Sequence, residues 1–241
     1  MPETLFISDV HLSAQRPQTV ELFVRFARVR ARQAEVVYIL GDLFDAWVGD
    51  DDDNAPAPAV RDALRDLTRH GVAVAFQGGN RDFLIGERFA AEAGLTLLPE
   101  EAVVDLYGVP TLLTHGDLLC TDDHDYQAAR RLLRSPAFIA EFLSKPLAER
   151  IALAGEYRRR SGEAVSLKAD DIMDVNEEAV ADMLRRHGAP RLVHGHTHRP
   201  GWHALLVEGT PAERLVLGEW HEDRGHVLSA SPDGLAVESF V

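Results

Sequence analysis

The sequence predicts an α/β fold in which strands and helices alternate and a group of strands follows at the C-terminus. Five short β-rich runs each end in polar residues, and helical patterns separate the first three of these runs. The C-terminal stretches "RLVLGEW", "GHVLSAS" and "GLAVESF" return to a strand pattern with Gly and Pro-Asp-Gly turns. We therefore expect an α/β layered sheet and a second, antiparallel-leaning sheet built from the C-terminal strands.

The first three strands are "TLFIS", "VVYIL" and "VAVAFQ", with helices predicted over about 18–32 and 57–70 between them. The second helical pattern ends in Arg69-His70-Gly71, which combines a cation in the last turn with a Gly stop. The runs "PTLLT" and "RLV" supply two further strands. Because ligands in such sheets bind outside the carboxyl ends of the strands, five loops are expected to converge on one site.

Residues 120–185 break this alternation and are typical of consecutive helices. Ser135-Pro136 suits an N-cap and first helical position, and Asn176 followed by two Glu residues indicates another helix start. A chain of 241 residues fits one large domain with an insertion. We interpret the segment as a helical cap inserted into a single domain that spans 1–241.

Composition and charge exclude several classes of protein. The formal net charge of −14 disfavours generic binding to nucleic acid. The single cysteine, Cys120, allows no internal disulfide and favours a reducing compartment. The chain has no signal-peptide pattern at its start and no apolar run near the roughly 20 residues of a transmembrane helix. We expect a cytoplasmic protein, at most peripheral to a membrane, with no obligate protein partner evident.

Side chains of metal-ligand type follow each of the five strands. Asp9 and His11 alternate after the first strand, so that both can face the same ion. Asp42 follows Gly41, which lets the backbone turn tightly after the second strand. The later strands are followed by Asn80, His115, His196 and His198. Carboxylate, carboxamide and imidazole ligands without cysteine suit Mn, Fe or Zn.

These seven candidate ligands are too many for one tetrahedral ion and suit two ions about 3.5–4 Å apart. From spacing alone, His196 and His198 could chelate one centre or reach two neighbouring centres. Each motif taken singly has a bland alternative, a surface Asp or His in a loop. No packing requirement explains the ordered combination, which therefore favours a two-metal site.

The motifs D-x-H, G-D-x-x-D, G-N-x-D, H-G-D and G-H-T-H, in this order, resemble those of the calcineurin-like binuclear metallophosphoesterases. This resemblance covers about 1–118 and 185–241 and implies a two-sheet α/β sandwich flanked by helices. It implies one metal held by Asp9, His11, Asp42 and His198. It implies a second metal held by Asp42, Asn80, His115 and His196, with Asp42 bridging the pair.

The residue after the motif Asn departs from the pattern, because many members of that family have His there and this chain has Arg81. Arginine stays protonated and cannot serve as a titrating acid, but it can clamp phosphate oxygens. We assign Arg81 to phosphate binding and charge stabilisation. Asp45 and Asp82 are candidates for orienting ligands such as His115 or His11 from behind.

A closer resemblance rests on "FISDVHLS", "YILGDLFDAWVGDDD", "GNRDFLIG", "HGDLLCTDDHDYQ", "IMDVN" and "HGHTHRP". These stretches are similar to those of the UDP-2,3-diacylglucosamine hydrolases, the pyrophosphatases of the lipid A pathway. The resemblance implies cleavage to UMP and 2,3-diacylglucosamine 1-phosphate, with Mn²⁺ as the usual metal. We expect water to attack the nucleoside-side phosphorus. The implied substrate contacts are Asn80, Arg81, Asp123, Ser161, Lys168 and His196.

The predicted cap differs in charge from the rest of the chain. Residues 124–168 contain nine basic and five acidic side chains, a local +4 in a chain of −14. Solvated helix faces explain most of these arginines, and the alternative is a face directed at phosphate or at anionic inner-leaflet lipid. The apolar cap residues either pack on the sheets or wall a chamber for acyl chains: Phe138, Ile139, Phe142, Leu147 and Ile151. Aspartates 50–53 are expected at the site rim, pairing with cap arginines.

Two other functions share the same core motifs. A general phosphodiesterase, nucleotide hydrolase or protein phosphatase would leave the basic, apolar cap unexplained. An inactive metal-stabilised scaffold typically lacks ligand positions, whereas all seven are present in this chain. The lipid-directed pyrophosphatase is therefore the favoured prediction.

Overall fold

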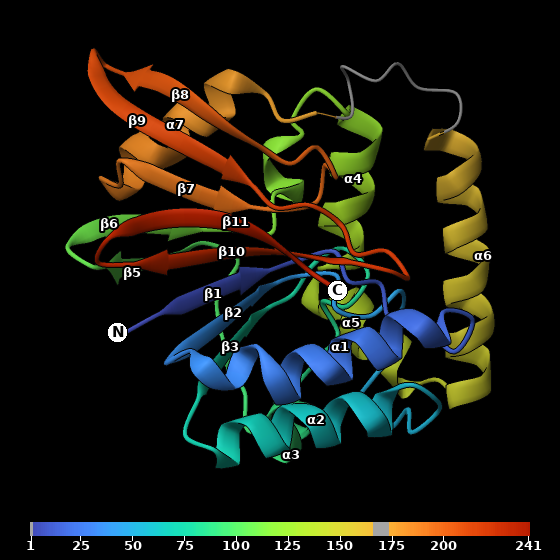
Figure 1. Cartoon of the computed structure of the whole chain (residues 1–241). Helices are drawn as coiled ribbons and strands as arrows, with labels where there is room; N and C mark the ends of the chain where they lie inside the picture. The colour runs from blue at the N-terminus through green and yellow to red at the C-terminus, as the bar shows by residue number, and fades with distance from the viewer. Residues whose placement is uncertain (1, 166–173) are drawn as a thin grey trace.

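The computed structural model is a sandwich of two sheets with helices on both outer faces (Figure 1). It describes the backbone of residues 2–165 and 174–241, and the side chains of residues 2–159 and 174–241. The layered α/β prediction and the two-sheet sandwich are both confirmed.

The six-stranded sheet has the order β11-β10-β1-β2-β3-β4. Its strands are β1 (Thr4–Ile7), β2 (Val36–Leu40), β3 (Ala73–Gln77), β4 (Thr96–Leu97), β10 (Gly225–Ser231) and β11 (Gly234–Phe240). Strands β1 to β4 are parallel, whereas β10 runs antiparallel to β1 and β11 antiparallel to β10. The carboxyl ends of β1, β2 and β3 therefore meet at one edge of this sheet.

The five-stranded sheet has the order β5-β6-β7-β9-β8. Its strands are β5 (Ala102–Leu106), β6 (Val109–Leu113), β7 (Arg191–His194), β8 (Gly201–Val207) and β9 (Thr210–Val216). Strands β6, β7 and β9 are mutually parallel, so the loops after β6 and β7 also emerge together. Side chains such as Phe6, Leu113 and Val193 fill the space between the two sheets.

The prediction that the three C-terminal runs form one separate sheet is wrong. Only "RLVLGEW" enters the five-stranded sheet, as β9, while β10 and β11 join the six-stranded sheet. Every residue of β1 is buried, and β10 pairs along it with Phe6 opposite Leu228. Strand β10 thereby covers a strand edge that would otherwise expose unpaired backbone groups.

Helices α1 (Pro17–Val29), α2 (Ala57–Arg69) and α3 (Glu87–Ala93) lie below the six-stranded sheet in Figure 1. The first two agree with the predicted helices to within a few residues. Helix α1 buries Leu22, Phe23 and Phe26 in the core between helices and sheet. Helix α7 (Glu177–His187) packs on the outer face of the five-stranded sheet, although it overlaps the predicted 120–185 insertion.

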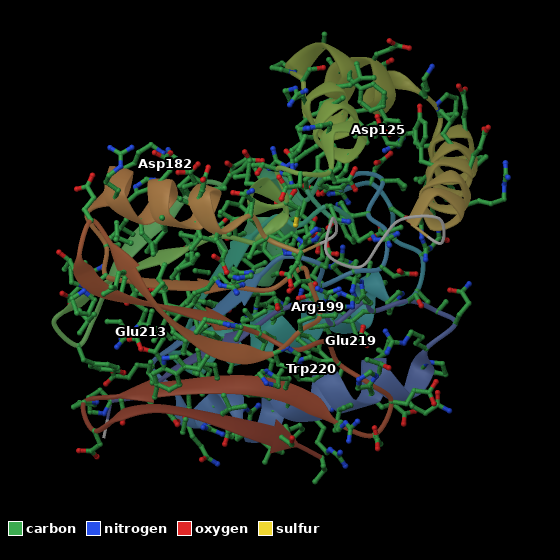
Figure 2. The ribbon with its side chains drawn as sticks, turned by 90° about the horizontal axis from the view of Figure 1, so that it is seen from above. Asp125, Asp182, Arg199, Glu213, Glu219 and Trp220 are labelled. Atoms are coloured by element: carbon green, nitrogen blue, oxygen red, sulfur yellow. The ribbon has the colours of Figure 1, made fainter. Side chains whose placement is uncertain are left out.

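Helices α4 (His124–Leu133), α5 (Pro136–Ser144) and α6 (Leu147–Val165) stand to one side of the sheets. We call these three helices the cap, and Figure 2 labels Asp125 within it. The two predicted helix N-caps are confirmed. Ser135 Oγ accepts from the Phe138 amide at 3.3 Å, and Asn176 Oδ1 accepts from the Ala179 amide at 3.0 Å. Among the described residues, no helix is both long and apolar enough to cross a membrane.

Buried Arg150 anchors the cap to the loop that follows β2. Its guanidinium donates to the Val48 carbonyl at 2.6 Å and to the Asp51 carboxylate at 2.8 Å. Asp51 thus pairs with a cap arginine, as predicted for the aspartate run. Asp50 instead accepts from the Gly86 and Phe89 amides, both at 3.0 Å, at the start of α3.

Candidate metal centre

The five strand-end loops pair with one another through their backbones. The Asp9 amide donates to the Gly41 carbonyl at 3.1 Å, and the Gly195 amide donates to the His115 carbonyl at 2.8 Å. The His196 amide joins the two groups of loops by donating to Asp9 Oδ2 at 3.0 Å. The convergence expected from the strand pattern is therefore present, with contributions from both sheets.

The first group of candidate ligands comprises Asp9, His11 and His198. His198 Nε2 lies 3.3 Å from both Asp9 Oδ1 and His11 Nε2. His11 Nδ1 lies 4.0 Å from Asp42 Oδ2, which brings the bridging candidate to the edge of the group. One cation could be held by these side chains.

A second group surrounds the carboxamide of Asn80. Asn80 Oδ1 lies 3.0 Å from His115 Nε2 and 2.9 Å from His196 Nδ1. Asp42 Oδ1 lies 3.7 Å from His115 Nε2, and Asp9 also has an oxygen within 4.8 Å of this pair. Asp42, which the two predicted ligand sets share, therefore lies near both groups, and Asp9 also has an oxygen close to both.

Burial controls the charge of these ligands. Burial raises the pKa of Asp42 to about 7, opposed by the charge of His115, because the fully buried carboxylate loses hydration. Burial likewise lowers the pKa of His11 to about 3 and that of His196 to about 4. The two imidazoles are thus neutral and able to bind a metal, and a cation beside Asp42 would stabilise its ionised form.

Five of the seven predicted ligands have left-handed backbone conformations that are rare outside glycine. Their φ angles lie between 52° and 69°, at Asp9, His11, Asp42, His196 and His198. Each such residue costs on the order of 1–3 kcal/mol and persists only where the surroundings impose it. The strained conformations turn the side chains from the strand ends toward one point, which no strand periodicity would predict.

Glycines allow the loops to approach the ligand carboxylates closely. A Cβ atom at Gly79 would lie 2.2 Å from Asp42 Oδ1, and one at Gly195 would lie 2.3 Å from Asp9 Oδ2. These glycines explain why G-N-x-D and G-H-T-H carry Gly directly before the ligand. They also show that the carboxylates have little room to move.

Unpartnered buried atoms fit the presence of cations. Asp9 Oδ1 and His11 Nδ1 are both buried and form no hydrogen bond with the described residues. Buried polar atoms are normally satisfied, and such exceptions occur where an ion or ligand binds. The oxygen and nitrogen donors match the hard or borderline divalent ions expected from the sequence.

Asp82 organises the ligand loops from behind. Its carboxylate accepts from the amides of Asp42 at 3.1 Å, Gly79 at 2.9 Å and Phe44 at 3.2 Å. It thereby fixes the Asp42 loop rather than a histidine ring. His115 is instead oriented by the Leu40 carbonyl, 2.8 Å from Nδ1.

Asp45 does not contact the ligand histidines that it was expected to orient. Its carboxylate pairs with Arg158 of α6 and lines the cavity next to the metal centre. Asp45 lies three residues after Asp42, where the chain has already turned toward the cap, and it therefore meets Arg158 instead of a ligand histidine. Asp45 therefore connects the core to the cap.

A buried ion-pair network missed by the sequence reasoning lies beneath the second ligand group. Asp117 Oδ2 accepts from Arg130 Nε at 2.7 Å, and Arg134 Nη2 donates to the Gly79 carbonyl at 2.8 Å. Burial alone would raise the pKa of Asp117, but the charges of His115, Arg134 and Arg130 lower it below its usual range. The only sequence signal was Asp117 in H-G-D, because the spacing to Arg130 on α4 and to Arg134 at its C-cap was not informative.

A cavity of about 410 Å³ opens beside the metal centre, between the core and the cap. Its polar lining includes Asn80, Arg81 and Asp123, together with charged side chains of the core and cap: Asp45, Asp125, Arg130, Arg134 and Arg158. Its apolar walls are formed by Phe83, Leu84, Leu133, Phe138, Phe142, Ala154 and Tyr157. The cap is therefore both a packing partner and a cavity wall, and Ile151 remains 44% exposed outside it.

The predicted substrate contacts divide into three groups, of which one is His196 alone, because it lies in the second ligand group, 2.9 Å from Asn80 Oδ1, and does not line the cavity. Asn80, Arg81 and Asp123 line the cavity, and Asp123 also caps α4 by accepting from the Tyr126 amide at 3.0 Å. Arg81 Nε is buried and has no hydrogen-bond partner among the described residues. Ser161 belongs to the backbone of α6, but its side chain lies outside the described residues, as does Lys168 entirely.

Comparison with known proteins assigns the family. A family model described as calcineurin-like phosphoesterase matches residues 3–200. The chain belongs to the calcineurin-like phosphoesterases. Members of this phosphoesterase family are metal-dependent hydrolases, and the convergent ligand groups agree with that activity.

Two similar calcineurin-like phosphoesterases are named UDP-2,3-diacylglucosamine hydrolase. The protein from Cellvibrio japonicus is 49% identical over 237 residues, covering 98% of each chain. The protein from Stenotrophomonas maltophilia R551-3 is 49% identical over 243 residues, again covering 98% of each chain. A solved structure of a hypothetical protein from Pyrococcus horikoshii, 10% identical with a TM-score of 0.51, covers 99% of this chain and 87% of its own. It supports the fold alone.

We expect Gly79→Ala to abolish metal binding at the candidate centre, because its Cβ would overlap Asp42 Oδ1. A displacement of about 1 Å can cost on the order of 100-fold in turnover. Metal content of the purified protein and hydrolysis of bis-p-nitrophenyl phosphate measure both effects. Gly155→Ala on α6 is the control, since a Cβ there meets nothing within 4 Å. Normal metal content in Gly79→Ala would contradict the close packing described.

Proposed function

We propose that this protein hydrolyses the pyrophosphate bond of UDP-2,3-diacylglucosamine, releasing UMP and 2,3-diacylglucosamine 1-phosphate in lipid A biosynthesis. The observation that carries the proposal is the cavity, whose lining combines Asn80 and Arg81 beside the metal centre with apolar side chains of the core and cap. A phosphodiester or a nucleotide alone would leave those apolar walls without a ligand group. The names and 49% identity of the full-length relatives support the same reaction.

In this proposal two divalent ions bind at the seven predicted positions. Asp9, His11 and His198 would hold one ion, Asn80, His115 and His196 would hold the other, and Asp42 would serve both. Such ions lower the pKa of water and offset charge on phosphate oxygens. We propose Mn²⁺ as the native metal, consistent with a donor set of oxygen and imidazole nitrogen without cysteine.

The guanidinium of Arg81, which stays protonated, is proposed to stabilise negative charge on the reacting phosphate. Its backbone amide donates to Asp42 Oδ1 at 2.8 Å, which ties its position to the metal centre. Its side chain faces the cavity with the Nε donor unused, so the guanidinium is free to bind phosphate oxygens. Asn80 precedes Arg81 in the chain and contacts His196 Nδ1 at 2.9 Å, and we propose both as further polar contacts to the substrate.

The cap supplies the lipid end of the proposed site. Phe138 and Phe142 of α5 stack with ring centroids 6.0 Å apart, and both line the cavity. Burying acyl methylenes against such walls contributes about 0.8 kcal/mol for each CH₂. Ser161 and Lys168 are proposed headgroup contacts. The single domain 1–241, with its 120–185 insertion, would then place lipid and nucleotide in one continuous site.

A panel of substrates tests the reaction directly. With Mn²⁺ present, the purified protein should release UMP from UDP-2,3-diacylglucosamine. It should act weakly on UDP-N-acetylglucosamine, free nucleotides and bis-p-nitrophenyl phosphate. In ¹⁸O-labelled water the label should enter UMP, because the nucleoside-side phosphorus is attacked. Equal rates across the panel would favour a general phosphodiesterase. Label in the sugar phosphate would show that water attacks the sugar-side phosphorus instead.

Two substitutions separate metal binding from phosphate binding. Asp42→Ala should lose both bound metal and turnover, since Asp42 adjoins both ligand groups. Arg81→Ala should retain two ions per chain but lose on the order of 100-fold or more in kcat, as expected for a charge that stabilises the transition state. Metal stoichiometry and steady-state kinetics measure both variants. An Arg81→Ala enzyme with unchanged kinetics would remove Arg81 from the mechanism.

We also propose that the protein docks on the anionic cytoplasmic face of the inner membrane through the basic side chains of its cap. Arg131 and Arg159 are exposed there on α4 and α6, away from the cavity lining. The double variant Arg131→Glu, Arg159→Glu should bind less to vesicles containing phosphatidylglycerol, because each cation near such a surface contributes about 1 kcal/mol. Arg69→Glu and Arg28→Glu, remote from the cap, form the charge-matched control. Equal cosedimentation of both double variants would argue against this surface.

A further inference from the structure

Glu219 contacts one of the proposed metal ligands from outside the seven predicted positions. It lies in the loop between β9 and β10, and its Oε2 is 2.7 Å from His198 Nδ1. The opposite nitrogen of the same ring, Nε2, lies 3.3 Å from Asp9 Oδ1 in the first ligand group. Nδ1 is thus the ring nitrogen that faces the Glu219 carboxylate, and Nε2 is the ring nitrogen directed at the ion site.

His198 needs such a partner more than the other ligand histidines do. Its side chain is 36% exposed, whereas those of His11 and His115 are 12% and 2% exposed. Its backbone is left-handed, with φ 54°, and the ring contact given for it is with His11, with centroids 5.2 Å apart. An exposed imidazole on a strained loop would lose rotamer freedom on binding a metal, unless another contact has already fixed it.

The loop that carries Glu219 is itself firmly held. The Trp220 amide donates to the Asp9 carbonyl at 3.0 Å, and Arg16 Nη2 donates to the Trp220 carbonyl at 2.8 Å. The fully buried Trp220 ring packs on Phe26 with centroids 5.3 Å apart. Figure 2 labels Glu219 beside this tryptophan. The carboxylate is thus presented from a rigid position adjoining the Asp9 loop.

We propose that Glu219 is a positioning residue that sets the tautomer and orientation of His198 and thereby raises the affinity of one of the two metal sites. The inference rests on the proposed function, since that assigns His198 as a ligand. A carboxylate behind a metal-bound histidine commonly contributes 10–100-fold in metal affinity. Glu219 contacts neither the cavity lining nor the second ligand group in the described structure.

Titration of the apoprotein with Mn²⁺, with free Mn²⁺ followed by electron paramagnetic resonance, tests the inference. Glu219→Ala should weaken one of two sites by about 10–100-fold and leave the other unchanged. Glu219→Gln should recover part of the loss, because its amide oxygen can still accept from Nδ1. The Mn²⁺ concentration required for half-maximal turnover should rise in parallel, while kcat at saturating Mn²⁺ stays near wild type.

Glu222→Ala is the matched control, because it removes the same charge from an exposed position on the same loop. Equal Mn²⁺ affinities in wild type and Glu219→Ala, or equal losses in Glu219→Ala and Glu222→Ala, would overturn the inference while leaving the proposed function intact. A wild-type protein that binds no Mn²⁺ would overturn both. If Glu219→Ala folds poorly, the Glu219→Gln titration decides, and wild-type affinity at both sites would then overturn the inference.

Discussion

Two carboxylates buried close together impose the constraint on which the rest of the structure depends. Asp9 and Asp42 have oxygens within 4.8 Å of each other at the strand ends, with almost no exposure to solvent. At an effective dielectric of about 20, two such charges repel by roughly 3–4 kcal/mol. The surrounding imidazoles, the Arg81 amide and the proposed cations offset that repulsion. Most of the unusual features of the molecule serve to hold these two groups in place.

Placing these two carboxylates requires strained backbone conformations and tight packing around them. Left-handed residues at the strand ends, glycines that admit no Cβ, and Asp82 bound to three amides all fix where the carboxylates point. Such strain persists only because two sheets and their covering helices surround the site. The sandwich therefore acts as a rigid frame, and the ligand loops are its most constrained segments.

The cap is connected to this frame by charges rather than by a continuous apolar core. Arg150 binds the loop after β2, Arg158 pairs with Asp45, and Arg130 and Arg134 reach Asp117 beneath the ligands. Apolar cap side chains consequently remain available to line the cavity. The cavity lining therefore combines charged and apolar side chains, which is the combination that the proposed substrate requires.

The sequence by itself determined the alternating strands and helices, the helix caps at Ser135 and Asn176, and the ligand residue types, because these follow from local periodicity and motif spacing. It did not reveal that β10 covers β1, that Asp45 turns to the cap, or that Glu219 lies behind His198. Each of those features joins segments distant in sequence, and no local pattern records which distant partner a strand edge or a carboxylate will meet. Tertiary structure decided those contacts, through burial of the side chains between the two sheets and through the ion pairs that join the cap to the core.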